Sequence, residues 1–146
     1  MSHEELMATF YRSLMNFDLA MFQAIQSDDV VYNISGHSPI SGCFRGKNRL
    51  IEEILPLVFG KINPEGFEFA KKWKCICHSD DTAVCIMEAD GMAANGVRYD
   101  QRYVHIFKFS GGKIVGVSEF FDTALADKAL FYDNPPAPGS DGSFEF

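Results

Sequence analysis

The chain has 146 residues, of which 47% are apolar and 14% aromatic, a composition that predicts one folded domain with a sizeable core and excludes a wholly disordered chain. The net charge of −7, from 20 acidic and 13 basic residues, disfavours a nucleic-acid binder, which normally carries a basic face. Because the apolar runs are too short to cross a bilayer and the first residues lack the basic start of a signal peptide, we expect no membrane association and a cytoplasmic protein.

The first half of the chain predicts helices with one short strand between them. Residues 3–27 carry apolar side chains at intervals of three or four, which indicates one amphipathic helix, or two joined near residues 16–18. Ser2, with Glu5 three residues later, resembles a capping box, and Asp18 is a candidate cap for a second helix. The elements that follow are a strand over 28–34, a loop over 35–46 and a helix over 47–59 that Pro56 would kink or end.

The second half alternates apolar and polar residues with a period of two, which is typical of strands. The predicted strands cover residues 67–78, 82–94, 97–109 and 113–122, and a short helical turn follows over 124–131. We place a single domain at residues 1–131 and a loose, turn-rich tail at 132–146, whose Phe144 and Phe146 could dock on the domain. This order of elements predicts an α+β fold, in which helices cover one face of a curved antiparallel sheet.

Two turns predict which strand residues lie opposite one another. Asn95–Gly96 is the strongest hairpin signal, because a two-residue type I′ turn needs positive φ at both central positions; it would pair Ala94 with Val97. A three-residue turn at residues 110–112 would pair Phe109 with Lys113. A shift of one residue in either pairing would turn every side chain of a strand to the other face.

These registers place Glu88, Tyr103 and Glu119 in one row, with His105 nearby, on the more aromatic face of the sheet. A carboxylate inside an apolar concavity must be paired, hydrogen-bonded or protonated. Glu119 and Glu88 are therefore candidate catalytic acid/base groups, and Tyr103 and His105 are candidates to orient a ligand or stabilise developing negative charge. The alternative is that both acids brace the sheet through Tyr103 or Lys71, and that His105 is a satisfied core histidine.

Other side chains are candidates for ligand contacts. Tyr32, Trp73, Tyr99, Phe121 and Phe10 are expected to line a pocket, His37 to lie in the loop at its rim, and Asp90 near the open end of its strand.

The four cysteines, Cys43, Cys75, Cys77 and Cys85, contain no C-x-x-C pair, so neither a zinc ribbon nor a thioredoxin-like motif is predicted. We expect reduced thiols in a cytoplasmic protein, with Cys75, Cys77 and Cys85 packed as small apolar core residues. No His/Cys/Asp cluster has metal-ligand spacing and no Gly-rich loop joins a strand to a helix, so we expect no metal and no cofactor.

Three stretches resemble one known superfamily: SDDVVY, SGCFRGKNRLIEEI, and YDQRYVHIFKFSGGKI followed by SEFFD. Over about residues 3–125 the chain is similar to the nuclear transport factor-like or SnoaL-like superfamily, which includes polyketide cyclases, ketosteroid isomerase, scytalone dehydratase and limonene epoxide hydrolase. The resemblance implies a cone-shaped, cystatin-like α+β fold. It does not name a reaction, because this fold hosts many chemistries and some non-catalytic binders.

The known active sites of this superfamily carry over only in part. The positions that resemble the tyrosine, the base and the acid of ketosteroid isomerase hold Phe10, Ile34 and His105, so the base is missing. The positions that resemble the two acids of limonene epoxide hydrolase hold Glu88 and Glu119, but the position of its linking arginine holds Ile86.

We therefore expect an apolar pocket that binds a small hydrophobic organic molecule. Any catalysis would be cofactor-free acid/base chemistry, as in an isomerase, cyclase, dehydratase or hydrolase; the alternative is a non-catalytic ligand-binding or dimerisation module of the same fold. An open cavity of roughly several hundred Å³ would favour ligand binding, and one filled by Phe10, Phe121 or Trp73 would favour the module.

A homodimer through the outer face of the sheet is also expected. Val104, Ile106 and Ile114 would form an apolar interface core amid charged residues on that face.

Overall fold

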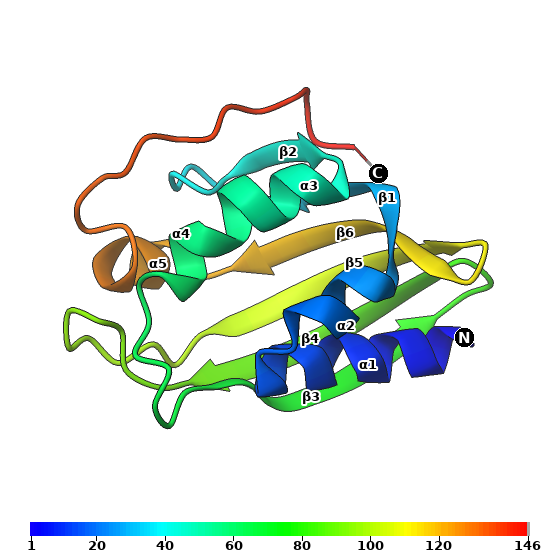
Figure 1. The fold of residues 1–146 in the computed structure, drawn as a ribbon, viewed down its shortest axis with the longest axis horizontal. Helices are drawn as coiled ribbons and strands as arrows, with labels where there is room; N and C mark the ends of the chain where they lie inside the picture. Colours follow the sequence, from blue (N-terminus) through cyan, green and yellow to red (C-terminus); the bar gives the residue numbers. More distant parts are fainter. Residues whose placement is uncertain (146) are drawn as a thin grey trace.

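The computed structural model describes residues 1–145 and contains one six-stranded sheet with helices on one of its faces (Figure 1). The helices are α1 (His3–Asn16), α2 (Leu19–Ala24), α3 (Lys47–Arg49), the π-helical turn η1 (Leu50–Ile54), α4 (Leu55–Phe59) and α5 (Thr123–Ala129). The strands are β1 (Gln26–Ile34), β2 (Gly42–Arg45), β3 (Glu68–His78), β4 (Thr82–Asp90), β5 (Arg102–Ser110) and β6 (Lys113–Phe121).

The strands lie in the order β2-β1-β6-β5-β4-β3, and the sheet is curved around the helices (Figure 1). The predicted α+β class, with helices on one face of a curved sheet, is confirmed. Four of the five strand pairs are antiparallel, and the structure adds one parallel pair, β1 with β6. This pair brings the first strand of the chain against the last.

The predicted caps at the N-terminal helices are present. The Ser2 and Glu5 side chains each accept a hydrogen bond from the other's backbone N–H, at 3.2 Å and 2.8 Å respectively, which forms the complete capping box. Phe17 ends α1 in the left-handed conformation, and Asp18 accepts a hydrogen bond from Met21 N–H at the start of α2. The chain therefore forms two helices with a corner between them.

Pro56 changes the helical segment of residues 47–59 without ending it. The Leu55 N–H reaches back five residues to Leu50 O, which makes the π-helical turn directly before the proline. Because proline has no N–H, it could not have continued the regular pattern of α-helical hydrogen bonds at the next position. The turn keeps Leu50 and Ile54 buried against the sheet.

The segment that joins β4 to β5 has a three-residue turn, residues 94–96, at its tip. The predicted two-residue turn is therefore wrong. Ala93 N–H donates to Val97 O at 2.8 Å, and Gly96, with φ of 84°, takes the left-handed position of the turn. The pairing therefore differs by one residue from the prediction, which turns β4 over relative to β5. Glu88 consequently pairs with Arg102 and faces outward.

The turn between β5 and β6 also differs from the prediction. Gly111 and Gly112 form a two-residue turn, with φ of 58° and 72°, and a β-bulge follows directly. The shorter turn and the bulge each shift the pairing by one residue, so from Gly116 onward the total shift of two changes the partners but keeps each side chain on its predicted face, whereas Ile114, before the bulge, turns to the inner face. Glu119 therefore lies opposite His105 instead of Tyr103.

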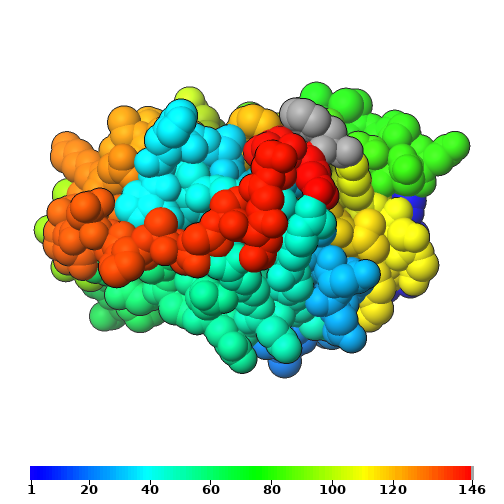
Figure 2. All heavy atoms as spheres, turned by 90° about the horizontal axis from the view of Figure 1, so that it is seen from above, coloured from blue at the N-terminus to red at the C-terminus, as the bar shows by residue number. Residues whose placement is uncertain are grey.

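The C-terminal segment 132–145, which we expected to be loose, runs along the edge strand β2 (Figure 2). Asp141 N–H donates to Cys43 O at 2.7 Å, and Arg45 N–H donates to the Asp141 carboxylate at 2.9 Å. These contacts cover backbone groups of an otherwise unpaired sheet edge.

The end of this segment reaches the outer face of the sheet. The Asn33 side-chain amide donates to Glu145 O at 2.8 Å and accepts from Glu145 N–H at 3.0 Å. The centroids of the Phe144 and Phe120 rings lie 5.8 Å apart, so Phe144 docks on the domain as we expected. Phe146, the other ring expected to dock, lies outside the described residues.

Candidate functional site

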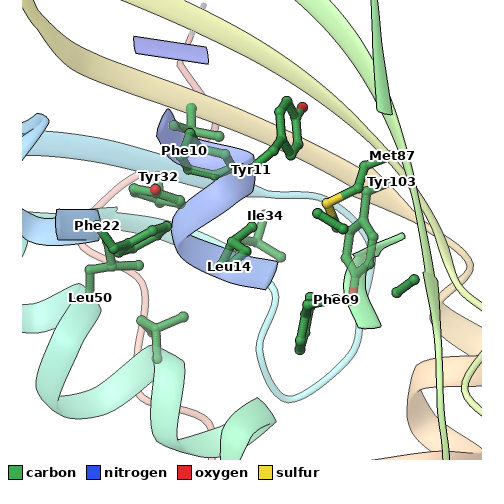
Figure 3. Close-up of a cluster of buried hydrophobic side chains, with 14 of the residues drawn as sticks. Phe10, Tyr11, Leu14, Phe22, Tyr32, Ile34, Leu50, Phe69, Met87 and Tyr103 are labelled. Atoms are coloured by element: carbon green, nitrogen blue, oxygen red, sulfur yellow. The ribbon is translucent and has the colours of Figure 1, made fainter. Parts of the chain in front are cut away.

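A small cavity lies between the inner face of the sheet and the helices, and Figure 3 shows the side chains that converge there from both. Its volume is about 60 Å³, and its walls come from α1, α2, the helical residues 50–59 and the sheet. Most of the walls are aliphatic or phenylalanine side chains. The polar side chains in them are those of Tyr32, Tyr99, Tyr103, His105 and Glu119.

Glu119 and His105 form the central pair of this site. His105 on β5 is 2% exposed, and its Nε2 lies 3.1 Å from Glu119 Oε1 on the neighbouring strand β6. The other ring nitrogen, Nδ1, lies 2.9 Å from the Tyr11 hydroxyl on α1. These contacts form a continuous hydrogen-bonded chain, Glu119–His105–Tyr11, which begins in the cavity and ends against the helix.

The hydrogen bonds assign the histidine tautomer. A carboxylate can only accept, so Nε2 of His105 carries the hydrogen and donates it to Glu119. In a neutral ring, Nδ1 is then the acceptor, and the Tyr11 hydroxyl donates to it. Burial raises the pKa of Tyr11 well above its ordinary value, which keeps this hydroxyl protonated as a donor.

A pair of tyrosines forms a second polar group beside the first. The hydroxyls of Tyr99 and Tyr103 lie 2.7 Å apart, and Gln101 Nε2 donates to Tyr99 at 3.4 Å. Burial raises the pKa of Tyr99 to about 12 and that of Tyr103 well above 10, so both phenols stay protonated at neutral pH. Each hydroxyl carries one hydrogen, and the hydrogen bond between the two uses only one of them. The other hydrogen can be donated to a ligand oxygen.

Several predicted site residues meet at the cavity. Phe10, Tyr32, Tyr99, Tyr103, His105, Glu119 and Phe121 all line it. The Tyr103 ring stacks on the His105 ring with centroids 5.7 Å apart, and the Phe10 ring meets His105 edge-on at 5.5 Å. Tyr32 presents only its ring as an apolar wall, because its hydroxyl donates to Gln26 at 2.7 Å.

Glu88 lies on the other side of the sheet, and the expectation that it points inward is wrong. Its carboxylate accepts from Arg102 Nε at 3.1 Å on the outer surface. The reason is the three-residue turn before β5, which reverses the facing of β4. Ala83, Cys85, Met87 and Ala89 occupy the inward positions instead.

Two further candidates also lie away from the cavity. His37 is exposed in the loop between β1 and β2 and is not among the cavity walls. Trp73 is on the inner face, but it is 36% exposed and is not among the cavity walls; its ring stacks on that of Tyr11, with centroids 4.7 Å apart. Trp73 therefore supports the Tyr11 end of the hydrogen-bonded chain and does not fill the cavity.

Asp90 belongs to a surface ion-pair group, so the expectation that it contacts a ligand in the cavity is wrong. Its carboxylate accepts from Arg98 through two contacts of 3.0 Å, and Lys71 Nζ lies 3.3 Å away. The hydrogen bonds from Arg98, followed by that from Lys71, lower the pKa of Asp90 from 3.8 to about 2. Asp90 is thus ionised across the physiological range.

This shift predicts how the Asp90→Asn variant responds to acid. A carboxyl group with a lowered folded-state pKa stabilises the fold above its unfolded value of 3.8, and this contribution disappears as the pH falls toward about 2. The variant should therefore be less stable than the wild type at neutral pH, and the two should converge in acid. Urea unfolding at about pH 7 and again near pH 2.5 measures both differences. A difference that stays constant between the two pH values contradicts this assignment.

The sequence interpretation missed Tyr11. The available signal was its position in α1, four residues after Met7 and three before Leu14, on the stripe of apolar residues that faces the sheet. A polar tip on such a stripe needs a buried partner, and His105 provides it.

Within residues 1–145, no group of three or more His, Cys, Asp or Glu side chains is placed to hold a metal ion. Among the described helices, none is long and apolar enough to cross a membrane.

Residues 7–117 match the family of SnoaL-like domains. Among curated proteins, none matches this chain. Solved structures that are similar include an NTF2-like protein from Burkholderia thailandensis, at 20% identity and a TM-score of 0.73, covering 86% of this chain and 95% of that one. A protein from Xanthomonas campestris with a cystatin-like fold is 24% identical, with a TM-score of 0.70 and coverages of 89% and 98%. TerC, co-crystallised with polyporic acid, is 18% identical, with a TM-score of 0.70 and coverages of 87% and 96%.

Proposed function

This chain belongs to the family of SnoaL-like domains, and on that basis we propose that it binds a small carbonyl compound in its cavity and moves a proton on it without a cofactor. The observation that carries this proposal is the Glu119 carboxylate in the wall of a largely apolar cavity, held there by the buried His105. Such a carboxylate is placed to accept a proton from a ligand, and most of its side chain is buried, with 20% exposed.

The polar groups around the cavity suggest a division of roles. Glu119 would accept a proton from the carbon next to the ligand's carbonyl group, and His105 would hold the carboxylate in place through Nε2. The spare hydrogen of the Tyr99–Tyr103 pair would donate to the carbonyl oxygen, where negative charge develops. Tyr11 would fix the tautomer of His105.

The size of the cavity restricts the ligand. At about 60 Å³ it is smaller than the ~150 Å³ apolar cavity that accommodates benzene in another protein, and well below the roughly several hundred Å³ that would favour ligand binding. A surface depression of about 210 Å³ adjoins it, and Leu14, Phe22 and Phe59 contribute to the walls of both. Rotation of these side chains would join the two spaces and admit a single-ring compound. The co-crystallisation of TerC with polyporic acid supports a small organic ligand for this fold.

Exchange of hydrogen for deuterium at the carbon beside a carbonyl group tests this function directly. Wild-type protein is mixed in deuterated buffer with a panel of small cyclic ketones and enones, and proton NMR follows the loss of the signal. We expect at least one compound to exchange faster with protein than in buffer alone. If no compound exchanges faster and none shifts the resonances of His105 or Tyr103, the proposal is wrong.

A second candidate function is a non-catalytic ligand-binding module. The observation that favours it is the small volume of the cavity, whose walls include the rings of Phe10 and Phe121. The same experiment separates the two functions, because a module would show shifted resonances with no faster exchange.

We further propose that the outer face of the sheet forms a homodimer. Ile86, Val104 and Phe120 lie in register across β4, β5 and β6, and Ile86 and Phe120 are 37% and 38% exposed. Ile114, which we expected in this interface, is wholly buried on the inner side because of the β-bulge that precedes Gly116. The ion pair of Glu88 and Arg102 borders the apolar row, as the polar rim of an interface would.

The Ile86→Lys variant tests the dimer. A lysine in the middle of an apolar interface leaves a charge without a partner, so we expect the variant to sediment as a monomer at micromolar concentrations at which the wild type is a dimer. Ile76→Lys is the matched control, because Ile76 is 58% exposed on the edge strand β3. A wild-type protein that sediments as a monomer at these concentrations removes the proposal.

A further inference from the structure

Two cysteines lie directly opposite each other on neighbouring strands. Cys75 on β3 pairs with Cys85 on β4, and both belong to the inner face, next to the pair of Trp73 and Met87. Ala89 N–H donates to the carbonyl oxygen of Gln101, the residue directly before β5. The backbone groups of a strand alternate in direction, so those of Cys85, four residues before Ala89, also point toward β5. Cys75 and Cys85 are therefore a non-hydrogen-bonded pair.

This type of pair suits a disulfide bond. The Cα atoms of a non-hydrogen-bonded antiparallel pair lie about 4.5 Å apart, which falls at the short end of the range of about 4.4–6.8 Å found for disulfides. Both cysteines are free thiols in the structure. A regular pair of this type therefore allows a disulfide without a change in strand pairing.

Of the three cysteines expected in the core, Cys85 is buried, but Cys75 is only half-buried and Cys77 is exposed, so the expectation is wrong for these two. Cys75 is half-buried on the edge strand of the sheet, where a small oxidant can reach it, and Cys85 is wholly buried. Burial, followed by the proximity of Cys75, raises the pKa of Cys85 to about 12. Because Cys85 is buried and the thiolate is the reactive form, Cys85 is a poor first target for an oxidant, and the more exposed Cys75 is the better one.

Cys85 also contacts the hydrogen-bonded chain of the cavity. Its sulfur lies 3.3 Å from the Met7 sulfur, and it approaches the Tyr11 hydroxyl closely enough to contribute to the raised pKa of that group. Tyr11 in turn bonds His105 at 2.9 Å and stacks on Trp73. A change at Cys85 is thus one contact away from the tyrosine that fixes the tautomer of His105.

We propose that Cys75 and Cys85 are a site of reversible oxidation to a cross-strand disulfide by hydrogen peroxide, and that the disulfide alters the hydrogen bond between Tyr11 and His105. In the first step the Cys75 sulfur attacks peroxide, an S–O bond forms, the O–O bond breaks, and the departing hydroxide takes the Cys75 thiol proton and leaves as water. In the second step the Cys85 sulfur attacks Cys75, the S–S bond forms, the S–O bond breaks, and the departing hydroxide takes the Cys85 thiol proton and leaves as a second water. Two thiols are oxidised by two electrons, and one peroxide is reduced to two waters. A dithiol reverses the reaction by exchange.

Peptide mapping after peroxide treatment tests the disulfide. The whole chain is oxidised, the remaining thiols are alkylated, and mass spectrometry identifies linked peptides. We expect a Cys75–Cys85 link that has lost two hydrogen atoms and that dithiothreitol removes. Cys77→Ser is the matched control, because Cys77 is exposed two residues away and opposite Val84; it should keep the link. Cys75→Ser and Cys75→Ala should both lose it.

Other products overturn the proposal. These are a Cys75–Cys77 link, an intermolecular disulfide through Cys77 in place of the expected link, or oxidation of Cys75 to sulfinic acid with Cys85 still free.

Two spectroscopic signals test the effect on the cavity. Trp73 is the single tryptophan and lies next to Cys75 on the inner face, so its fluorescence should change on oxidation and recover with dithiothreitol. The ¹⁵N resonances of the His105 ring report its tautomer, and we expect them to shift together with the fluorescence. If the link forms and these resonances stay unchanged, the coupling to His105 is wrong.

Discussion

Replacement of Glu119 by glutamine is expected to slow proton exchange on a responsive ligand by about 10²–10⁴-fold, the range typical of a lost general base. Glutamine has the same shape, and its amide oxygen can still accept the hydrogen from His105 Nε2. The free energy of unfolding should therefore stay within about 1 kcal/mol of that of the wild type. Exchange rates from NMR and urea unfolding of the same samples measure the two quantities separately.

Glu88→Gln is the matched control for this variant. Glu88 is the same residue type on the same sheet, but its carboxylate faces the outer surface and pairs with Arg102. We expect exchange at the wild-type rate, and at most a small change in stability, because exposed ion pairs contribute little. Equal losses of rate in the two variants would show that the carboxylate at position 119 has no special role.

Replacement of Tyr103 by phenylalanine is expected to lower the exchange rate by about 10²–10³-fold, as for a lost donor to developing negative charge. The Tyr103 ring stacks on His105, so its hydroxyl is fixed relative to the Glu119–His105 pair. The substitution keeps the stacking and removes one hydrogen-bonding oxygen. Ligand affinity should change less than the rate, because the hydrogen bond strengthens as charge develops on the ligand oxygen.

Tyr99→Phe separates this role from general loss of the tyrosine pair. In this variant Tyr103 keeps its hydroxyl beside His105 and loses only its neighbour at 2.7 Å. We therefore expect a smaller loss of rate than in Tyr103→Phe. The reverse order would assign the donor to Tyr99, and no loss in either variant would remove the pair from the mechanism.

Local signals in the sequence were sufficient for the helix ends. The Ser2 and Asp18 caps depend on residues three positions away, so a short window of sequence contains both partners of each hydrogen bond. The sheet and its helical cover also follow from periodicity, which needs no knowledge of distant residues.

The β4–β5 register could not be predicted in the same way. Asn95–Gly96 is compatible with a two-residue and a three-residue turn, because both place glycine at positive φ. Contacts with distant residues stabilise the longer one: Ala94 N–H donates to Lys61 O at 2.8 Å, and the Asn95 side chain donates to Lys128 O at 3.1 Å. The inward prediction for Glu88 failed for this reason.

The sequence correctly predicted that Glu119 on β6 faces the cavity, but it predicted the wrong residue of β5 opposite it. Glu119, Tyr103 and His105 all face inward because a shift of two residues preserves the alternation along a strand. The bulge itself has no local signature, since Ile114 N–H is held by Ile25 O, which lies far away in the chain. The hydrogen bond between Glu119 and His105 could not be predicted, because it depends on the pairing of these two residues that the bulge produces.

The parallel pairing of β1 with β6 also affects how the protein is made. During synthesis, residues 26–34 leave the ribosome long before residues 113–121, so β1 and β2 must wait for the last strand before they join the rest of the sheet. A nascent chain that stops at β5 can form the β1–β2 pair and the β3–β4–β5 meander only as two separate pieces, and it lacks the strand that carries Glu119. Because closing such a long loop is slow, the complete sheet forms late, and the last strand to be translated determines when the cavity exists.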